Sequence, residues 1–218
     1  MSKVISFCGF ERGDIVYYIA AMLTKNGNSV LVIDNSYNND LYGAATNFDD
    51  GYEKDYVIKQ NITYIKNVNY NTDTEEVYDF VIIWQGMNIK EEVLMQSEYV
   101  YLQSDFSPMS LKALKGLISD RDNLSGVIAR ESVESNKITE KTLFEFLGIP
   151  ESKLITTLVY DGKDYENYMA YLYNGRQRFQ SLSPNFNDCI KAVTQNILGI
   201  EKKQVEKLFA KAKKAKKL

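Results

Sequence analysis

An apolar run that leads into two glycines opens the chain: Lys3-Val4-Ile5-Ser6-Phe7-Cys8-Gly9-Phe10-Glu11-Arg12-Gly13-Asp14-Ile15. The first part has strand character, and a glycine-bounded loop follows it. The segment after the loop has apolar residues at the spacing of one helix face: Ile15, Tyr18, Ile19 and Met22. Gly27 is a helix stop signal. The stretch therefore predicts a strand, a tight loop and a helix over residues 14–26.

This order of elements is the frame in which backbone N–H groups and a helix N-terminus bind phosphate. Phosphate chemistry of that kind requires Gly-Lys-Ser/Thr at the end of the loop, where the lysine contacts the phosphates and the hydroxyl binds Mg²⁺. The corresponding residues here are Gly13, Asp14 and Ile15. A carboxylate at Asp14 repels phosphate, and Ile15 offers no oxygen to a metal. We therefore expect the strand, loop and helix of a phosphate-binding site without the side chains that bind phosphate and Mg²⁺.

Two further apolar runs predict strands that are buried on both faces. Residues 29–34 end in Asp34, and residues 78–84 end in Trp84. Stretches of strand and helix character alternate through most of the remaining chain. The alternation predicts an α/β fold, with a mostly parallel twisted sheet of about seven strands and helices on both faces.

At these residues the chain resembles the ParA/MinD group of P-loop ATPases, which have a deviant phosphate loop. Members of the group read Lys-Gly-Gly-x-Gly-Lys-Thr after the first strand, then Gly-x-x-Val-Leu-x-Ile-Asp-x-Asp, then Tyr-Asp-x-Ile-Ile-x-Asp. The second and third patterns are similar to residues 27–36 and 78–84 of this chain. Downstream, residues 98–111 look like the group's next strand with the loop and helix that follow it, and residues 124–130 look like the strand that ends in an adenine-contacting Asn. The resemblance covers about residues 3–199, as a P-loop NTPase-like fold.

Position by position, this chain departs from the group at the residues that serve ATP. The loop lysine of the group falls on Asp14, the hydroxyl for Mg²⁺ on Ile15, the signature lysine near Cys8, the second acid after strand two on Ser36, and the metal-orienting acid on Trp84. The adenine-contacting Asn is replaced by Ala129 or Arg130. Only Asp34 matches the pattern. Phosphoryl transfer depends on positioning and electrostatics, so the resemblance implies a pseudo-ATPase with no catalytic residue, cofactor or metal.

The vestigial pocket consists of Gly9, Glu11, Arg12, Gly13, Asp14, Ile15, Asp34 and Trp84, and each residue has a structural interpretation beside a functional one. The two glycines permit a tight turn or preserve some ligand binding. Trp84 fills the core or pocket, or contacts a partner. Asp34 orders a loop or caps a helix, or retains a site role. Arg12 and Glu11 pair with Asp14 across the loop, or are solvated.

Composition favours a single cytoplasmic α/β domain at residues 1–200. The chain has 218 residues, 44% of them hydrophobic, with three prolines and no histidine. No stretch approaches the roughly 20 apolar residues of a membrane span, and no basic-then-apolar leader is present. We therefore expect the protein to stay inside the cell. Its two cysteines form no metal or redox motif.

Residues 201–218 differ from everything before them. Their net charge is +6, whereas the whole chain carries −3 and the first 200 residues therefore carry −9. The segment predicts a basic amphipathic helix that contacts an anionic surface through Lys202, Lys203, Lys207, Leu208, Phe209, Lys211, Lys213, Lys214, Lys216 and Lys217. Relatives of MinD end in such helices, so the resemblance supports peripheral contact with the inner face of the membrane. A solvated terminus and a nucleic-acid contact are the alternatives.

Two classes of function follow. The first is a non-catalytic scaffold, a constitutive homodimer that positions a protein partner within a pilus, secretion or partition assembly. Atypical members of the group localise pilus machinery, which favours this class. The second is a nucleotide-binding switch in which Arg12 replaces the missing lysine, because arginine can bind phosphate bidentately.

Overall fold

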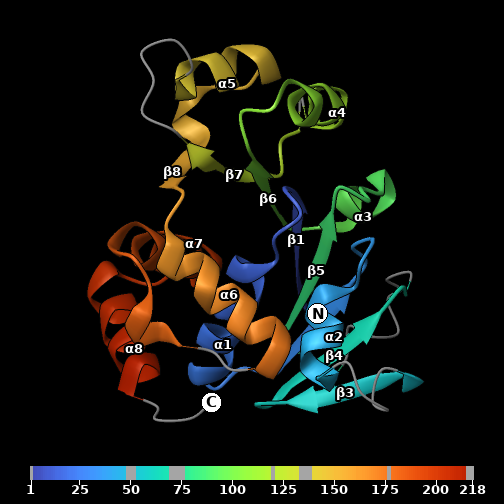
Figure 1. Ribbon diagram of the computed structural model, residues 1–218, viewed down its shortest axis with the longest axis vertical. Coiled ribbons are helices and arrows are strands. Elements are labelled where there is room, and N and C mark those ends of the chain that lie inside the picture. Colours follow the sequence, from blue (N-terminus) through green and yellow to red (C-terminus); the bar gives the residue numbers. More distant parts are fainter. Residues whose placement is uncertain are drawn as a thin grey trace.

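A mixed sheet forms the centre of the computed structural model, which describes residues 2–47, 53–68, 77–118, 121–132, 139–175 and 178–214. The sheet has eight strands within these residues, in the order β3-β4-β2-β5-β1-β6-β7-β8 (Figure 1). All neighbouring strands are parallel except β3 and β4. The bounds are β1 Lys3–Gly9, β2 Val30–Asp34, β3 Tyr56–Lys59, β4 Ile62–Lys66, β5 Phe80–Gly86, β6 Tyr99–Ser104, β7 Leu124–Ser132 and β8 Leu154–Val159.

Helices cover both faces of the sheet. They are α1 Asp14–Lys25, α2 Asp40–Thr46, α3 Glu91–Gln96, α4 Pro108–Ile118, α5 Glu140–Leu147, α6 Gly162–Asn174, α7 Pro184–Leu198 and α8 Lys202–Lys214, with short 3-10 turns η3 Glu151–Lys153 and η4 Phe179–Ser181. The core of one face takes side chains from α1, α2, α6, α7 and α8. The core of the other face takes them from α3, α4 and α5. The predicted α/β fold with helices on both faces is confirmed.

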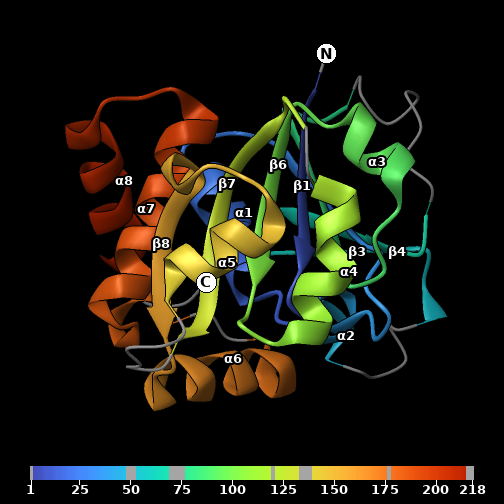
Figure 2. The same cartoon turned by 90° about the horizontal axis from the view of Figure 1, so that it is seen from above.

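The central strands place one loop at the middle of the sheet's carboxyl edge. β1 pairs with β5 on one side and with β6 on the other, so the loop between β1 and α1 emerges between two neighbours. All residues of β2 and β5 are buried, as expected for strands covered on both faces. α6 lies across the carboxyl ends of the strands (Figure 2). The loop after β1 and α6 therefore meet at this edge.

One strand, β3, was not predicted from the sequence. About seven strands were therefore expected, whereas eight are present in the described residues. β3 is a four-residue edge strand whose residues alternate between exposed and half-buried. It therefore lacks the continuous apolar run that marks the central strands. It pairs antiparallel with β4, an arrangement that a short connection permits.

The C-terminal helices close one face of the core. The side chain of Ser183 accepts a hydrogen bond from the backbone N–H of Phe186 at the start of α7, and Pro184 stands in the first turn. Gly199 ends α7 in a left-handed conformation. α8 then returns and packs against α1 and α7. No helix in the described part of the chain is long and apolar enough to cross a membrane.

Candidate functional site

The loop between β1 and α1 turns sharply at Gly9. This residue has a φ of +103°, and a Cβ atom added to it would lie 1.9 Å from the backbone oxygen of Gln103. Gly13 has an ordinary φ, but an added Cβ would lie 2.9 Å from the Leu41 side chain. The interpretation of a glycine that permits a tight turn is therefore confirmed for Gly9, whereas Gly13 permits close packing against Leu41.

Three backbone N–H groups of this loop and of the first turn of α1 donate to the protein itself. The N–H of Phe10 donates to the backbone oxygen of Gln103 over 2.8 Å, and the N–H of Arg12 donates to that of Phe10 over 2.9 Å. The N–H of Ile15, in the first turn of α1, donates to Asp14 Oδ1 over 2.9 Å. A phosphate-binding loop directs such groups at its ligand. Here these three donors already have acceptors.

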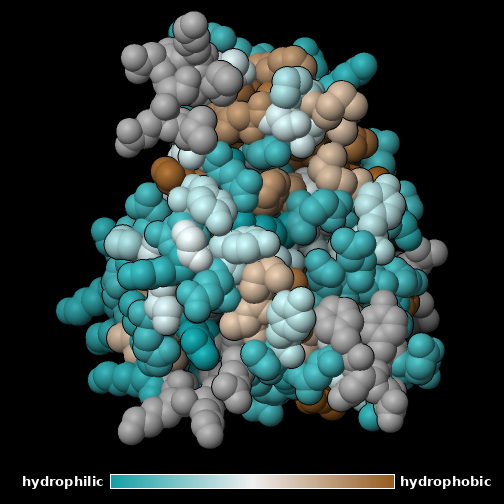
Figure 3. Space-filling view, viewed as in Figure 1, coloured by the Kyte–Doolittle hydropathy of each residue, from teal (hydrophilic) through white to brown (hydrophobic). Residues whose placement is uncertain are grey.

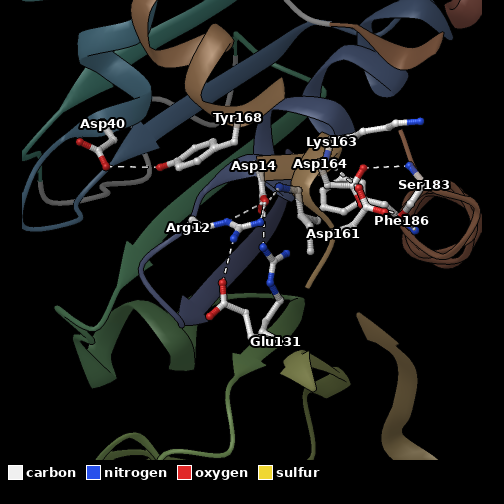
Figure 4. A network of polar contacts seen from close by, with 12 residues as sticks. Arg12, Asp14, Asp40, Glu131, Asp161, Lys163, Asp164, Tyr168, Ser183 and Phe186 are labelled. Atoms are coloured by element: carbon white, nitrogen blue, oxygen red, sulfur yellow. Dashed lines mark hydrogen bonds and ion pairs between the residues drawn. The ribbon is translucent and has the colours of Figure 1, made fainter. Parts of the chain in front are cut away.

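Asp14 lies at the start of α1, with 1% of its surface exposed. Its Oδ2 accepts hydrogen bonds from Arg12 Nε at 3.2 Å and Arg12 Nη2 at 3.1 Å. It also accepts one from Arg130 Nη2 at 2.8 Å, although Arg130 is 116 residues away. Figure 4 shows how the guanidinium of Arg12 bridges Asp14 and Glu131. The pairing of Arg12 with Asp14, one of the two sequence interpretations, is confirmed.

Aromatic rings surround both guanidinium groups. Arg130 Cζ lies 5.3 Å from the ring centre of Phe10 and 5.8 Å from that of Phe186. Arg12 Cζ lies 5.4 Å and 5.7 Å from the rings of Tyr165 and Tyr168 on α6. Such contacts favour a cation that has been taken out of water.

The charge on Arg12 is held by the surrounding carboxylates. Burial alone lowers the pKa of the Arg12 guanidinium, but Asp14 and Glu131 outweigh it and raise that pKa above its ordinary value. Arg12 Nη1 donates to Glu131 Oε1 over 2.9 Å. Arg12 therefore connects the loop after β1 with the end of β7.

Glu11 contacts the end of β5. Its Oε1 accepts a hydrogen bond from the backbone N–H of Met87 over 2.7 Å, and its carboxylate packs against Gly86, where a Cβ would lie 2.5 Å from Oε2. Burial raises the pKa of Glu11. Glu11 thus fastens the loop to the neighbouring strand, and of the two loop residues only Arg12 pairs with Asp14.

Asp34 orders the segment that follows β2. It accepts hydrogen bonds from Ser36 Oγ at 2.6 Å, from the Ser36 backbone N–H at 3.1 Å and from the Tyr42 backbone N–H in α2 at 3.0 Å. Burial raises the pKa of this carboxyl to about 6, despite these hydrogen bonds. The loop-ordering interpretation of Asp34 is confirmed, because its two oxygens accept from Ser36 and from Tyr42.

Trp84 is part of the core. It is 1% exposed and belongs to the apolar cluster beneath α1 and α7. In the sheet it lies in register with Asp34 of β2 and Phe7 of β1. The core-filling interpretation is confirmed for Trp84.

These side chains do not fit a magnesium–nucleotide complex. The Asp14 carboxylate lies where the fold directs a helix N-terminus at phosphate, and two guanidinium groups are bound to it. Ile15 is fully buried and apolar. The Ser36 hydroxyl is bound to Asp34. α6 adds a wall over the edge of the sheet, where Tyr168 Oη donates to Asp40 Oδ2 over 3.3 Å.

The expected contact of α8 with an anionic surface needs a correction. Leu208 and Phe209, the expected apolar anchors, are only 7% and 5% exposed and belong to the core. Phe209 meets the ring of Phe179 edge-on at 5.8 Å. The helix was expected to turn its apolar side toward lipid, but that side is already covered by the protein.

The lysines of α8 point outward. Lys202, Lys203, Lys207, Lys211 and Lys214 are exposed, and Lys213 is half-buried. The surface over α8 is mostly hydrophilic (Figure 3). Lys216 and Lys217, also predicted to contact an anionic surface, lie outside the described residues.

Arg130 is the site residue to which the sequence gave no role. It is 1% exposed and ends an otherwise apolar stretch of β7. Arginine is almost never fully buried without a partner, so an arginine that directly follows the apolar run of a strand could have been recognised as a site residue from the sequence. Its partner was not deducible, because the pairing depends on the register of β7 with β6.

The architecture is an α/β fold with a mostly parallel sheet and helices on both faces, like that of P-loop NTPases. No protein-family model and no curated protein matches the chain. Several solved structures, however, are similar to it in fold. A chain of the MinC:MinD cell division protein complex of Aquifex aeolicus has a TM-score of 0.69 at 14% identity, over 92% of this chain and 97% of that one.

Two other structures extend the comparison. The ParA family ATPase of Chlorobium tepidum TLS has a TM-score of 0.56 at 13% identity, over 97% of each chain. Apo McdA of Cyanthece has a TM-score of 0.59 at 11% identity, over 90% of this chain and 100% of that one. At such identities the likeness shows the fold, and the fold is ParA/MinD-like.

Proposed function

We propose that this protein is a non-catalytic ParA/MinD-like scaffold that positions another component of a cellular assembly, of the pilus, secretion or partition type. The observation that carries the proposal is the buried Asp14 carboxylate at the start of α1, bound by Arg12 and Arg130. Phosphoryl transfer in this fold requires a cationic, metal-binding site at that point. The residues present supply neither the lysine nor the hydroxyl.

Partner binding is the activity left to such a scaffold. One similar structure is a complex of two cell division proteins, MinC and MinD. By analogy, we propose that this chain also acts through protein partners, and that it pairs with a second copy of itself without nucleotide. The analogy rests on fold alone.

The alternative, a nucleotide switch that uses Arg12, has little support. Nε and Nη2 of Arg12 donate to Asp14, and Nη1 donates to Glu131. A phosphate would have to displace both carboxylates from Arg12. The scaffold is therefore the better account of this site.

Phosphate release and light scattering test the proposal together. The full chain, incubated with ATP and Mg²⁺, is expected to release no phosphate above a buffer blank. Its mass in solution is expected to equal that of a dimer with and without ATP. Turnover would contradict the loss of catalysis, and an ATP-induced change from monomer to dimer would favour the switch.

A further inference from the structure

Cationic groups converge at the N-terminus of α1. Three N–H groups, two from Arg12 and one from Arg130, donate to a single oxygen, Oδ2 of Asp14. α1 is twelve residues long, and its N-terminus adds the partial positive charge of the helix dipole. The site therefore has the composition of an anion-binding site, and a side chain of the chain itself is the anion.

One donor of this site has no acceptor in the described part of the chain. Nη1 of Arg130 is buried and has no hydrogen-bond partner among the described residues. It belongs to a side chain that is 1% exposed. A cavity of about 10 Å³, enough for one water molecule, is lined by Arg130, Arg12, Glu131 and Phe186, among others. A buried guanidinium with a free N–H group beside a cavity is a group that can bind a further oxygen.

We infer that the start of α1, with Arg12 and Arg130, is an oxyanion-binding site and that the Asp14 carboxylate is its built-in ligand. Removal of this carboxylate opens the site to small oxyanions from solution, either carboxylates or phosphate. The inference rests on the proposed function, in which the protein binds no nucleotide. It adds that the Asp14 carboxylate stands where a nucleotide phosphate would bind. It also explains the burial of Arg130, whose charge needs an anionic partner.

The test is chemical rescue of Asp14→Ala. This variant leaves the space of a carboxylate next to a buried, unpaired arginine, so it is expected to be less stable than the wild type. Sodium formate at 100 mM should raise the Tm of the variant by about 3 °C or more, because an anion that binds only the folded state stabilises it. Inorganic phosphate, tested separately, shows whether a larger oxyanion enters.

Two comparisons make the rescue specific. The wild type, whose site is filled, should show only the general effect of salt. The double variant Asp14→Ala, Arg130→Met lacks the buried cation and should respond to formate no more than the wild type. If Asp14→Ala is unfolded in buffer, formate is expected to restore its helical circular dichroism.

Several results would overturn the inference: no response of Asp14→Ala to formate, or an equal response in the wild type or the double variant. These outcomes are separate from those that test the proposed function. ATP turnover by the wild type would refute the scaffold, whereas a failed rescue refutes only the role of Asp14 as internal anion.

Discussion

The loop after β1 and the helix α8 both carry charged residues that the sequence analysis linked to a ligand or a surface. In the fold, the Asp14 charge at the loop is buried, whereas most of those of α8 are exposed. Where the loop enters α1, Asp14 is buried and binds the buried Arg130 of β7. In α8 the lysines stay exposed, while Leu208 and Phe209 are buried. Burial therefore decides which charges belong to the protein's own structure and which are available to an external surface.

The difference has an energetic consequence. Breaking a buried ion pair by removing one partner typically costs about 3–5 kcal/mol, because the other charge stays buried and unpaired. Removing an exposed lysine changes stability by about 0.5 kcal/mol or less. The comparison can thus be tested by substitution in each region.

The largest effect is expected from Phe209→Ala. The ring contacts Phe179, and Lys191 Nζ and Lys213 Nζ lie 5.7 Å and 5.1 Å from its centre. Its loss leaves a cavity in the core and should reduce the free energy of unfolding by about 3–5 kcal/mol. Urea unfolding measures this.

Lys207→Ala is the matched control for Phe209→Ala, because Lys207 lies on the exposed side of the same helix. It should stay within about 0.5 kcal/mol of the wild type. If Phe209→Ala were equally mild, the apolar side of α8 would be free and the original expectation of lipid contact would return.

Asp34 should give the protein a characteristic pH dependence. Its pKa is raised by burial from 3.8 to about 6, so between these values the folded state binds more protons than the unfolded state. Stability is therefore highest below pH 3.8 for this group and falls as the pH rises to about 6. The total change is about 3 kcal/mol, from about 1.4 kcal/mol per pKa unit.

Asp34→Asn isolates that contribution, because asparagine does not titrate. The free energy of unfolding of the wild type, minus that of the variant, should fall across this pH range. A difference that stays flat would mean that Asp34 is not a buried carboxyl with a raised pKa.

Much of the fold was predictable because its central strands are continuous apolar runs. Helix 14–26 was expected and α1 covers Asp14–Lys25. The strand expected to end at Trp84 is β5, which continues to Gly86. β3 was not predicted, because a short edge strand with alternating exposure resembles a loop in sequence.

The site was less predictable than the fold. Local residues offered the pairing of Arg12 with Asp14 as one of two alternatives, since these residues are two positions apart, and the structure selects it. The contact with Arg130 arises from sheet topology, which no local pattern records. The apolar stripe of α8 was visible, but whether protein or lipid covers such a stripe is decided by tertiary packing.

The smallest effect is expected at an anionic membrane. Because Leu208 and Phe209 are buried, only the charge of the lysines can attract α8 to the membrane. Each lysine contributes about 1 kcal/mol or less to the free energy of binding near such a surface. Flotation with phosphatidylserine-containing vesicles should show weak binding at low salt that disappears as salt screens the charges. Replacement of Lys202, Lys203, Lys207 and Lys211 by Gln should weaken this binding further without unfolding the protein.

Two outcomes of the vesicle experiment would contradict this prediction. Binding that persists at high salt would indicate apolar insertion, against the burial of Phe209. Binding of DNA in place of vesicles would assign the lysines to nucleic acid.

Titration calorimetry of the full chain with ATP and Mg²⁺ tests the central claim most directly, because the claim is that Asp14, Arg12 and Arg130 already occupy the site with one another. The account predicts no saturable binding in the micromolar range, with or without Mg²⁺. Saturable micromolar binding that depends on Mg²⁺ would contradict it and establish a nucleotide site in spite of the carboxylate at the start of α1.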